Sequence, residues 1–145
     1  MVKKKITFIA NSILFIWFFL DMIGMTINKR VLVLQSWKYD GIFFIIYITS
    51  FLFFIFKERT GKYILSVWLF MWLITQFYFH WCFTIFGPWE GRIKYFDDTI
   101  KLISSTTVYI PDLYHILLHI FILFALISTL IYCTMKKTSK DKIIS

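Results

Sequence analysis

The sequence has few residues that break helices and few that carry charge. Its 145 residues include five glycines, two prolines and two cysteines, and only 17% are Asp, Glu, Lys or Arg. Soluble domains carry about 25% charged residues, whereas 59% of this chain is hydrophobic and 22% is aromatic. A chain of this length cannot bury so much apolar surface in water. The composition therefore excludes an ordinary soluble domain and favours a protein whose solvent is lipid.

The scarcity of cysteine and glycine excludes further classes of protein. The two thiols, Cys82 and Cys133, fall in the third and fourth apolar runs, near opposite faces of a predicted membrane protein. Bridged cysteines need Cα atoms within about 7 Å, so we interpret both as buried thiols. The glycines are scattered along the chain, which excludes a phosphate-binding loop and a dinucleotide fingerprint.

Acidic residues are also few, with eight against sixteen Lys and Arg and a net charge of +8. The basic residues stand at the ends of apolar runs and form no basic surface interleaved with aromatic residues. Proteins that bind single-stranded nucleic acid use such an interleaved surface. We therefore expect no nucleic-acid partner and interpret the basic residues as topology signals, with the lipid bilayer as the first partner.

Four long apolar runs dominate the chain and predict transmembrane helices at about residues 6–27, 39–56, 63–86 and 112–135. About 20 residues at 1.5 Å per residue cross a hydrocarbon core of roughly 30 Å. No cleavage site of small residues follows the first run, so we interpret it as a retained anchor. The predicted fold is an all-α integral membrane protein, with residues 1–145 forming a single four-transmembrane-helix bundle.

The connections between the runs indicate which helices are neighbours. The second run, Ile42–Phe56, is short for a span, and we expect it to gain length from residues 37–41. The charged turn at residues 57–62 is short enough to make the second and third helices antiparallel neighbours. Pro111 stands where it can open the fourth helix without losing a helical hydrogen bond.

The distribution of Lys and Arg predicts the orientation. Cytoplasmic segments carry the excess of these residues, and a cytoplasmic N-terminus gives ten on that side and six on the other. The sequence therefore predicts an N-in/C-in protein of the cell membrane. The ten are Lys3, Lys4, Lys5, Lys57, Arg59, Lys62, Lys136, Lys137, Lys140 and Lys142, and the six are Lys29, Arg30, Lys38, Arg92, Lys94 and Lys101.

The connection at residues 87–110, called the cap, is longer than a four-helix bundle requires. Its aromatic and aliphatic residues alternate with charged ones, which is typical of an interfacial helix that lies on the membrane with its aromatic side down. An ordinary solvated loop is the alternative. The sequence leaves both interpretations open.

Ionisable residues inside a membrane cost roughly 2.5–3.5 kcal/mol each and are functional candidates. Asp21 and His80 each lie about seven residues before their helix reaches the outer face, which is roughly 10 Å inside it. The fourth helix starts at that face, so His119 has a similar depth. Asp112, His115 and His119 have the spacing i, i+3, i+7, which puts them on one stripe of the fourth helix. The predicted polar cluster is Asp21, His80, Asp112, His115 and His119.

The residue types in this cluster are those that bind a divalent transition metal such as zinc. Such a site uses the three histidines and one aspartate. Further residues are expected to contribute from the third helix or from the cap, namely Gln76, Glu90, Asp97 and Asp98. Proton handling and a purely structural helix-pairing role are alternatives for the same residues.

Three functions remain open at this stage. The first is a membrane-embedded metal-binding or catalytic site, with no catalytic residue assigned. The second is a small membrane protein that binds a membrane protein partner, such as an immunity factor or an accessory transporter subunit. The third is a binder of a lipid-like ligand, with aromatic walls from Trp68, Trp72, Phe77 and Trp81.

Overall fold

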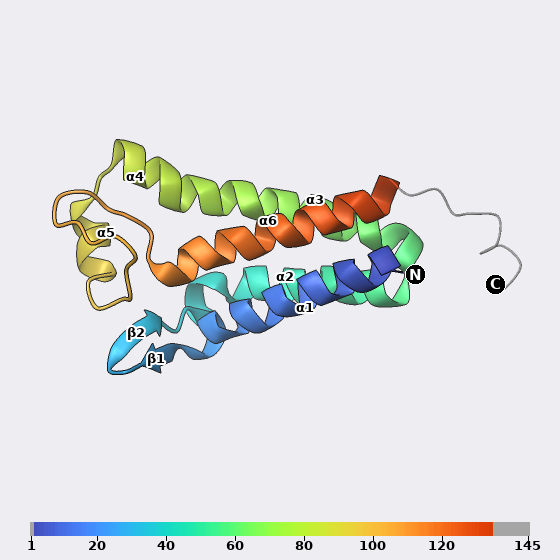
Figure 1. The fold of residues 1–145 in the computed structure, drawn as a ribbon, viewed down its shortest axis with the longest axis horizontal. Helices are drawn as coiled ribbons and strands as arrows, with labels where there is room; N and C mark the ends of the chain where they lie inside the picture. Colours follow the sequence, from blue (N-terminus) through green and yellow to red (C-terminus); the bar gives the residue numbers. More distant parts are fainter. Residues whose placement is uncertain (1, 135–145) are drawn as a thin grey trace, which may run out of the picture.

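Four long helices run side by side in the computed structural model, which describes residues 2–134 (Figure 1). They are α1 (Val2–Ile23), α2 (Trp37–Phe56), α3 (Glu58–Phe77) and α6 (Leu113–Thr134). Helix α3 continues through one turn of π-helix, η1 (Tyr78–Cys82), into α4 (Phe83–Phe86). All four are long and apolar enough to cross a membrane, with α3, η1 and α4 counted as one span. The prediction of four such helices is confirmed.

The bundle has two distinct ends. At the turn end, α2 and α3 are separated by Lys57 alone, whose backbone N–H donates to the Phe53 carbonyl at 2.8 Å. A Cβ on Gly61 would lie 2.2 Å from the same carbonyl oxygen, so glycine allows the two helices to meet here. At the other end, called the cap end, the cap lies across the helix ends (Figure 1).

The helix boundaries differ from the predicted ones in ways that have local causes. Helix α3 begins at Glu58 and not at residue 63, because the expected turn at residues 57–62 contracts to one residue. Helix α2 gains the expected length by beginning at Trp37. Helix α6 begins at Leu113, one residue after the predicted start, and its predicted last residue, Met135, lies outside the described residues, as do Lys136, Lys137, Lys140 and Lys142.

The first predicted helix, residues 6–27, is wrong at its end. Helix α1 stops at Ile23 because Gly24 adopts a φ of 73°. The chain then forms an antiparallel hairpin of β1 (Met25–Ile27) and β2 (Arg30–Val33). Asn28 and Lys29 take positive φ values of 49° and 67°, as the two central residues of a tight hairpin turn require. The fold is therefore mostly helical with one small sheet, and is not all-α.

The cap contains one short helix, α5 (Glu90–Tyr95), and is otherwise irregular, so it combines a helical segment with loop. Strand β2 extends into the cap through Val31, whose N–H donates to Asp98 O at 3.2 Å and whose carbonyl accepts from Ile100 N at 2.9 Å. Ile100 also accepts from Leu113 N at 2.9 Å. The hairpin, the cap and the start of α6 are thus one hydrogen-bonded unit.

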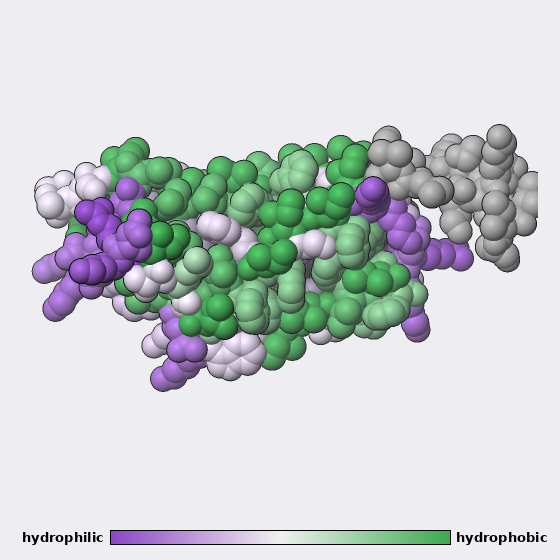
Figure 2. All heavy atoms as spheres, turned by 60° about the horizontal axis from the view of Figure 1, so that its bottom comes forward, coloured by the Kyte–Doolittle hydropathy of each residue, from purple (hydrophilic) through white to green (hydrophobic). Residues whose placement is uncertain are grey.

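Aromatic residues fill the centre of the bundle. Trp72 is 1% exposed, and its ring centroid lies 4.5 Å from that of Phe18 and 5.4 Å from that of Tyr47. Many large apolar residues face outward instead, and Figure 2 shows them covering the helical body with hydrophilic residues gathered at its two ends. This surface matches a bilayer, where apolar residues are stable on the outside.

A buried polar network lies between the core and the turn end. The Tyr47 hydroxyl donates to Asn11 O at 2.7 Å, and the Asn11 amide donates to Thr7 O at 2.9 Å and approaches Thr129 Oγ1 at 3.4 Å. Thr7 in turn donates to Ser128 O at 3.0 Å. These bonds join α1, α2 and α6, as polar groups between transmembrane helices commonly do.

Candidate functional site

A cavity of about 110 Å³ lies at the cap end, where residues from all four long helices meet. Helix α1 contributes one wall residue, α2 and α6 contribute two each, and α3 with η1 contributes four. The lining residues are Asp21, Asp40, Phe43, Thr75, Gln76, Phe79, His80, His115 and Leu118. Two carboxylates, two imidazoles and an amide thus share a space among apolar helices.

Helix α6 orients one of these imidazoles through its first turn. Asp112 is 1% exposed and precedes the helix, and its Oδ1 accepts from the His115 backbone N–H at 2.9 Å, which is the bond of an N-cap. The same oxygen lies 2.6 Å from His115 Nδ1. Because a carboxylate only accepts, Nδ1 carries the proton and Nε2 of a neutral His115 is an acceptor.

The second imidazole, that of His80, lies on the π-helical turn η1, a local widening of a helix that often occurs at functional sites. His80 is 6% exposed, and its Nδ1 lies 2.6 Å from the Tyr109 hydroxyl. Burial, together with the negative charge of Asp112, raises the pKa of Tyr109 well above its ordinary value, so this hydroxyl keeps its proton. The Tyr109 oxygen also accepts a hydrogen bond from Arg92, whose guanidinium can only donate, so the hydroxyl proton goes to Nδ1 and a neutral His80 carries its own proton on Nε2.

The three histidines of the chain come together. The His80 ring centroid lies 4.2 Å from that of His115 and 5.6 Å from that of His119. His119 lies behind the cavity wall, where Nδ1 bonds to the His115 carbonyl and the ring contacts Trp81. The predicted cluster is therefore gathered in space, with His80 and His115 at the cavity and His119 outside it.

Two carboxylates complete the cavity. Asp21 is 4% exposed and belongs to the last turn of α1, and Asp40 belongs to the first turn of α2. Asp21 interacts electrostatically with Asp40, Asp112 and His115, and it accepts a hydrogen bond from the Ser36 side chain. A carboxylate at a helix C-terminus faces the negative end of the helix dipole. Asp21 is thus in an electrostatically costly position.

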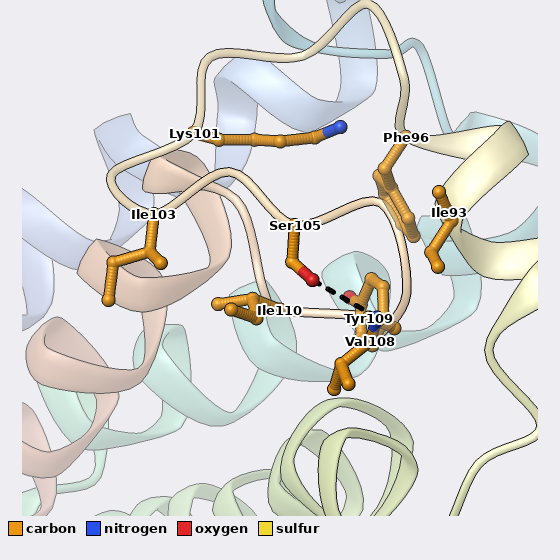
Figure 3. A pocket seen from close by; sticks show the side chains of 8 residues that line it. All are labelled: Ile93, Phe96, Lys101, Ile103, Ser105, Val108, Tyr109 and Ile110. Carbon is orange, nitrogen blue, oxygen red and sulfur yellow. Dashed lines mark hydrogen bonds between the residues drawn. The ribbon is translucent and has the colours of Figure 1, made fainter.

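The cap forms a roof over the two imidazoles. The Phe96 ring centroid lies 5.4 Å from that of His115 and 6.3 Å from that of His80, and Tyr109 is 2% exposed. Figure 3 shows Phe96 near Tyr109, which belongs to the loop at residues 101–110, and this loop folds back through a bond from Val108 N to Ser105 Oγ at 3.1 Å. The pocket drawn there has about 10 Å³, too little for a ligand. The roof is therefore closely packed.

The predicted contributors from the cap do not reach the cavity. Glu90, Asp97 and Asp98 are exposed, and Asp97 faces Lys101 across 3.7 Å. Their backbone runs along the outer side of the roof, where water solvates the charges. Of the predicted contributors, Gln76 alone lines the cavity.

The metal hypothesis is not supported. Within residues 2–134, no group of three or more His, Cys, Asp or Glu side chains is arranged to hold a metal ion.

The aromatic residues proposed to wall an apolar ligand pocket point to different surroundings. Trp72 lies in the core, Phe77 is 52% exposed, and Trp81 contacts His119. Trp68 packs on Phe43 with ring centroids 5.6 Å apart. These residues do not form one shared wall.

Sequence reasoning missed Asp40, Tyr109 and Ser36. The signal for Asp40 was available, because it stands one turn inside the start of the second helix, at the depth used to select the histidines. No local signal marks Tyr109, whose position depends on the path of the irregular cap. The same holds for Ser36, which follows a hairpin that was not predicted.

The site has an excess of hydrogen-bond acceptors. Gln76 Oε1 lines the cavity region and is buried without a partner in the part of the chain that the structure describes. The carboxylates of Asp21 and Asp40 accept only, and His115 Nε2 accepts when neutral. The lining contains no Lys or Arg. Opposing these groups, His80 presents one N–H donor, and the other donors of this set are on the Gln76 amide nitrogen.

Comparisons of the chain with family models, with curated proteins and with solved structures give no match. The function is therefore argued from the site.

Proposed function

We propose that this chain is a four-span protein of the cell membrane, with both termini in the cytoplasm, and that its cavity binds the cationic group of a small ligand near the outer face. The excess of Lys and Arg on the N-terminal side in the sequence supports this orientation. In this orientation, the cap end lies at the outer face of the membrane.

The observation that carries the proposal is that Asp21 and Asp40 line one cavity with no Lys or Arg in its wall. A buried carboxylate such as Asp21 is costly without a counter-charge, and it also faces the negative end of its helix, while the half-buried Asp40 adds a second negative charge. A fold that needed only hydrogen bonds at this position could use Asn. A bound cation supplies the missing charge and satisfies the acceptors that the protein leaves open.

The geometry further favours an ammonium group over a metal ion. A primary ammonium has three N–H donors, which match Asp21, Asp40 and the open amide oxygen of Gln76. His115 Nε2, oriented by Asp112, adds a fourth acceptor for the ammonium N–H groups. The cavity of about 110 Å³ accommodates such a group with a short carbon link.

The test is an equilibrium titration of the purified full chain in detergent with ethanolamine, followed by tryptophan fluorescence. We expect saturable binding that weakens at least tenfold in Asp21→Asn and in Asp40→Asn. Acetate, an anion of similar size, should not bind.

Asp97→Asn is the matched control, because this carboxylate is exposed on the cap and outside the cavity. We expect its affinity for ethanolamine to equal that of the wild type. Absence of saturable binding, or equal weakening by all three substitutions, would overturn the proposal and favour the alternative of a protein-interaction role.

A further inference from the structure

The cavity is closed toward the cap and open toward the side. Phe96 and Tyr109 cover His80 and His115 on the cap side. The hairpin is fixed to the cap through Val31. An aqueous ligand that approaches along the bundle axis therefore meets packed aromatic rings.

The exposure of the lining residues locates the mouth. The deep residues Asp21, His80 and Leu118 are 4%, 6% and 1% exposed. Apart from the half-buried His115 on α6, the more accessible ones belong to α2 and to α3 with η1, and Phe79 is 47% exposed. The mouth thus lies between the cap-end halves of α2 and α3, far from the tight backbone contact that Gly61 makes at the turn end.

The surface around this mouth is apolar. Ile42 is 59% exposed on α2, and Tyr78 is 57% exposed beside Phe79 on η1. The mouth belongs to segments that are long and apolar enough to span a membrane. An opening between such segments faces acyl chains and not water.

We infer that the ligand is a phospholipid with a primary ammonium headgroup, of the phosphatidylethanolamine class, which enters sideways between α2 and α3. This inference rests on the proposed function and names its ligand. The ammonium lies between Asp21 and Asp40, the acyl chains stay in the bilayer, and the cavity volume admits the amine end alone. The N–H on His80 Nε2 is then the donor available to the headgroup oxygens.

The donor count sets the selectivity. A primary ammonium offers three N–H donors to the open acceptors, whereas the trimethylammonium of phosphatidylcholine offers none and is bulkier. Discrimination by unmet buried acceptors is stronger than discrimination by size. We therefore expect a preference for the ethanolamine headgroup of at least tenfold.

The experiment measures 1:1 binding of dioleoyl phosphatidylethanolamine, dioleoyl phosphatidylcholine and free ethanolamine to the full chain by native mass spectrometry in detergent. We expect phosphatidylethanolamine to bind at least tenfold more tightly than either of the others. Ile42→Trp, beside the mouth and outside the cavity wall, should weaken lipid binding tenfold and leave ethanolamine binding within threefold. Phe70→Trp, at a residue 53% exposed and outside the cavity wall, is the control and should change neither.

The outcomes separate this inference from the proposed function. If ethanolamine binds through Asp21 and Asp40 but the two lipids bind equally, or no more tightly than ethanolamine, the lipid inference is wrong and the cation site stands. If neither ethanolamine nor the ethanolamine lipid binds, both are wrong. Equal effects of Ile42→Trp and Phe70→Trp would contradict the lateral mouth.

Discussion

The Tyr109 hydroxyl lies 2.6 Å from Nδ1 of His80, although the two residues belong to different parts of the chain. Tyr109 is in the irregular cap and His80 is on the π-helical turn. The bond fixes which His80 nitrogen faces the cavity. The roof thus determines the hydrogen-bonding character of the site below it.

Tyr109→Phe removes this donor and leaves His80 Nδ1 buried without a partner. We expect a loss of about 1–3 kcal/mol in unfolding free energy and weaker ethanolamine binding, because the neutral imidazole is no longer held in one tautomer. Tyr95→Phe is the control, since Tyr95 is 52% exposed on the cap. SDS titration of both variants measures the stability difference, and equal losses would show that the Tyr109 bond has no special role.

The same hydroxyl predicts an effect at high pH. Burial raises the pKa of Tyr109, so the folded chain retains this proton where the unfolded chain loses it, above about pH 10. The folded state then binds more protons, and the stability from this group is present below pH ~10 and is lost as the pH rises. The stability difference between wild type and Tyr109→Phe should therefore shrink above pH ~10. A constant difference up to pH ~11 would contradict this assignment.

Asp112 has two separable roles, as helix cap and as partner of the His115 ring. Asn is also a good N-cap, whereas replacing a capping Asp with Ala costs about 1 kcal/mol. We expect Asp112→Asn to keep most of the stability and to weaken ethanolamine binding, while Asp112→Ala loses both. If Asp112→Asn binds like the wild type, the charge on Asp112 does not act on the site.

Asp21→Asn tests whether this position is selected for binding or for stability. Because Asp21 is buried at the negative end of α1 and near two other carboxylates, we expect the variant to unfold at equal or higher SDS concentration than the wild type. Ethanolamine binding should be lost. A destabilised variant would instead mean that the carboxylate holds the bundle together.

Gly61→Ala tests the close approach of α2 and α3. The added Cβ would lie 2.2 Å from Phe53 O, which is backbone and cannot move aside cheaply. We expect a loss of several kcal/mol or failure to fold, on the order of the largest single-residue effects. Gly91→Ala, with open space around the added Cβ, should be neutral. Yield of folded protein and SDS titration compare the two variants.

The sequence was informative where the position of a site residue follows from regular helix geometry. The i, i+3 spacing of Asp112 and His115 predicted their contact, because helix geometry alone brings them together. The depth of His80 predicted its meeting with α6. Asp40 followed from the same reasoning but was overlooked.

The remaining features depend on long-range packing that no local pattern records. Residues 25–27, which read Met-Thr-Ile, continue the first hydrophobic run in the sequence, and their departure into a hairpin begins at the positive φ of Gly24. The cap residues Glu90 and Asp97 have the right chemistry for the site but lie on the outer side of the roof. Composition could not distinguish the two sides of an irregular segment.

The one-residue turn at Lys57 has a mechanical consequence. From this joint to Asp40, helix α2 is about 25 Å long, at 1.5 Å per residue. With the joint held fixed by the contact at Gly61, a change of about 2° in the angle between α2 and α3 moves their far halves apart by about 1 Å. Thinning or thickening of the surrounding bilayer tilts helices. Such a change would therefore alter the width of the gap between α2 and α3 at Phe43.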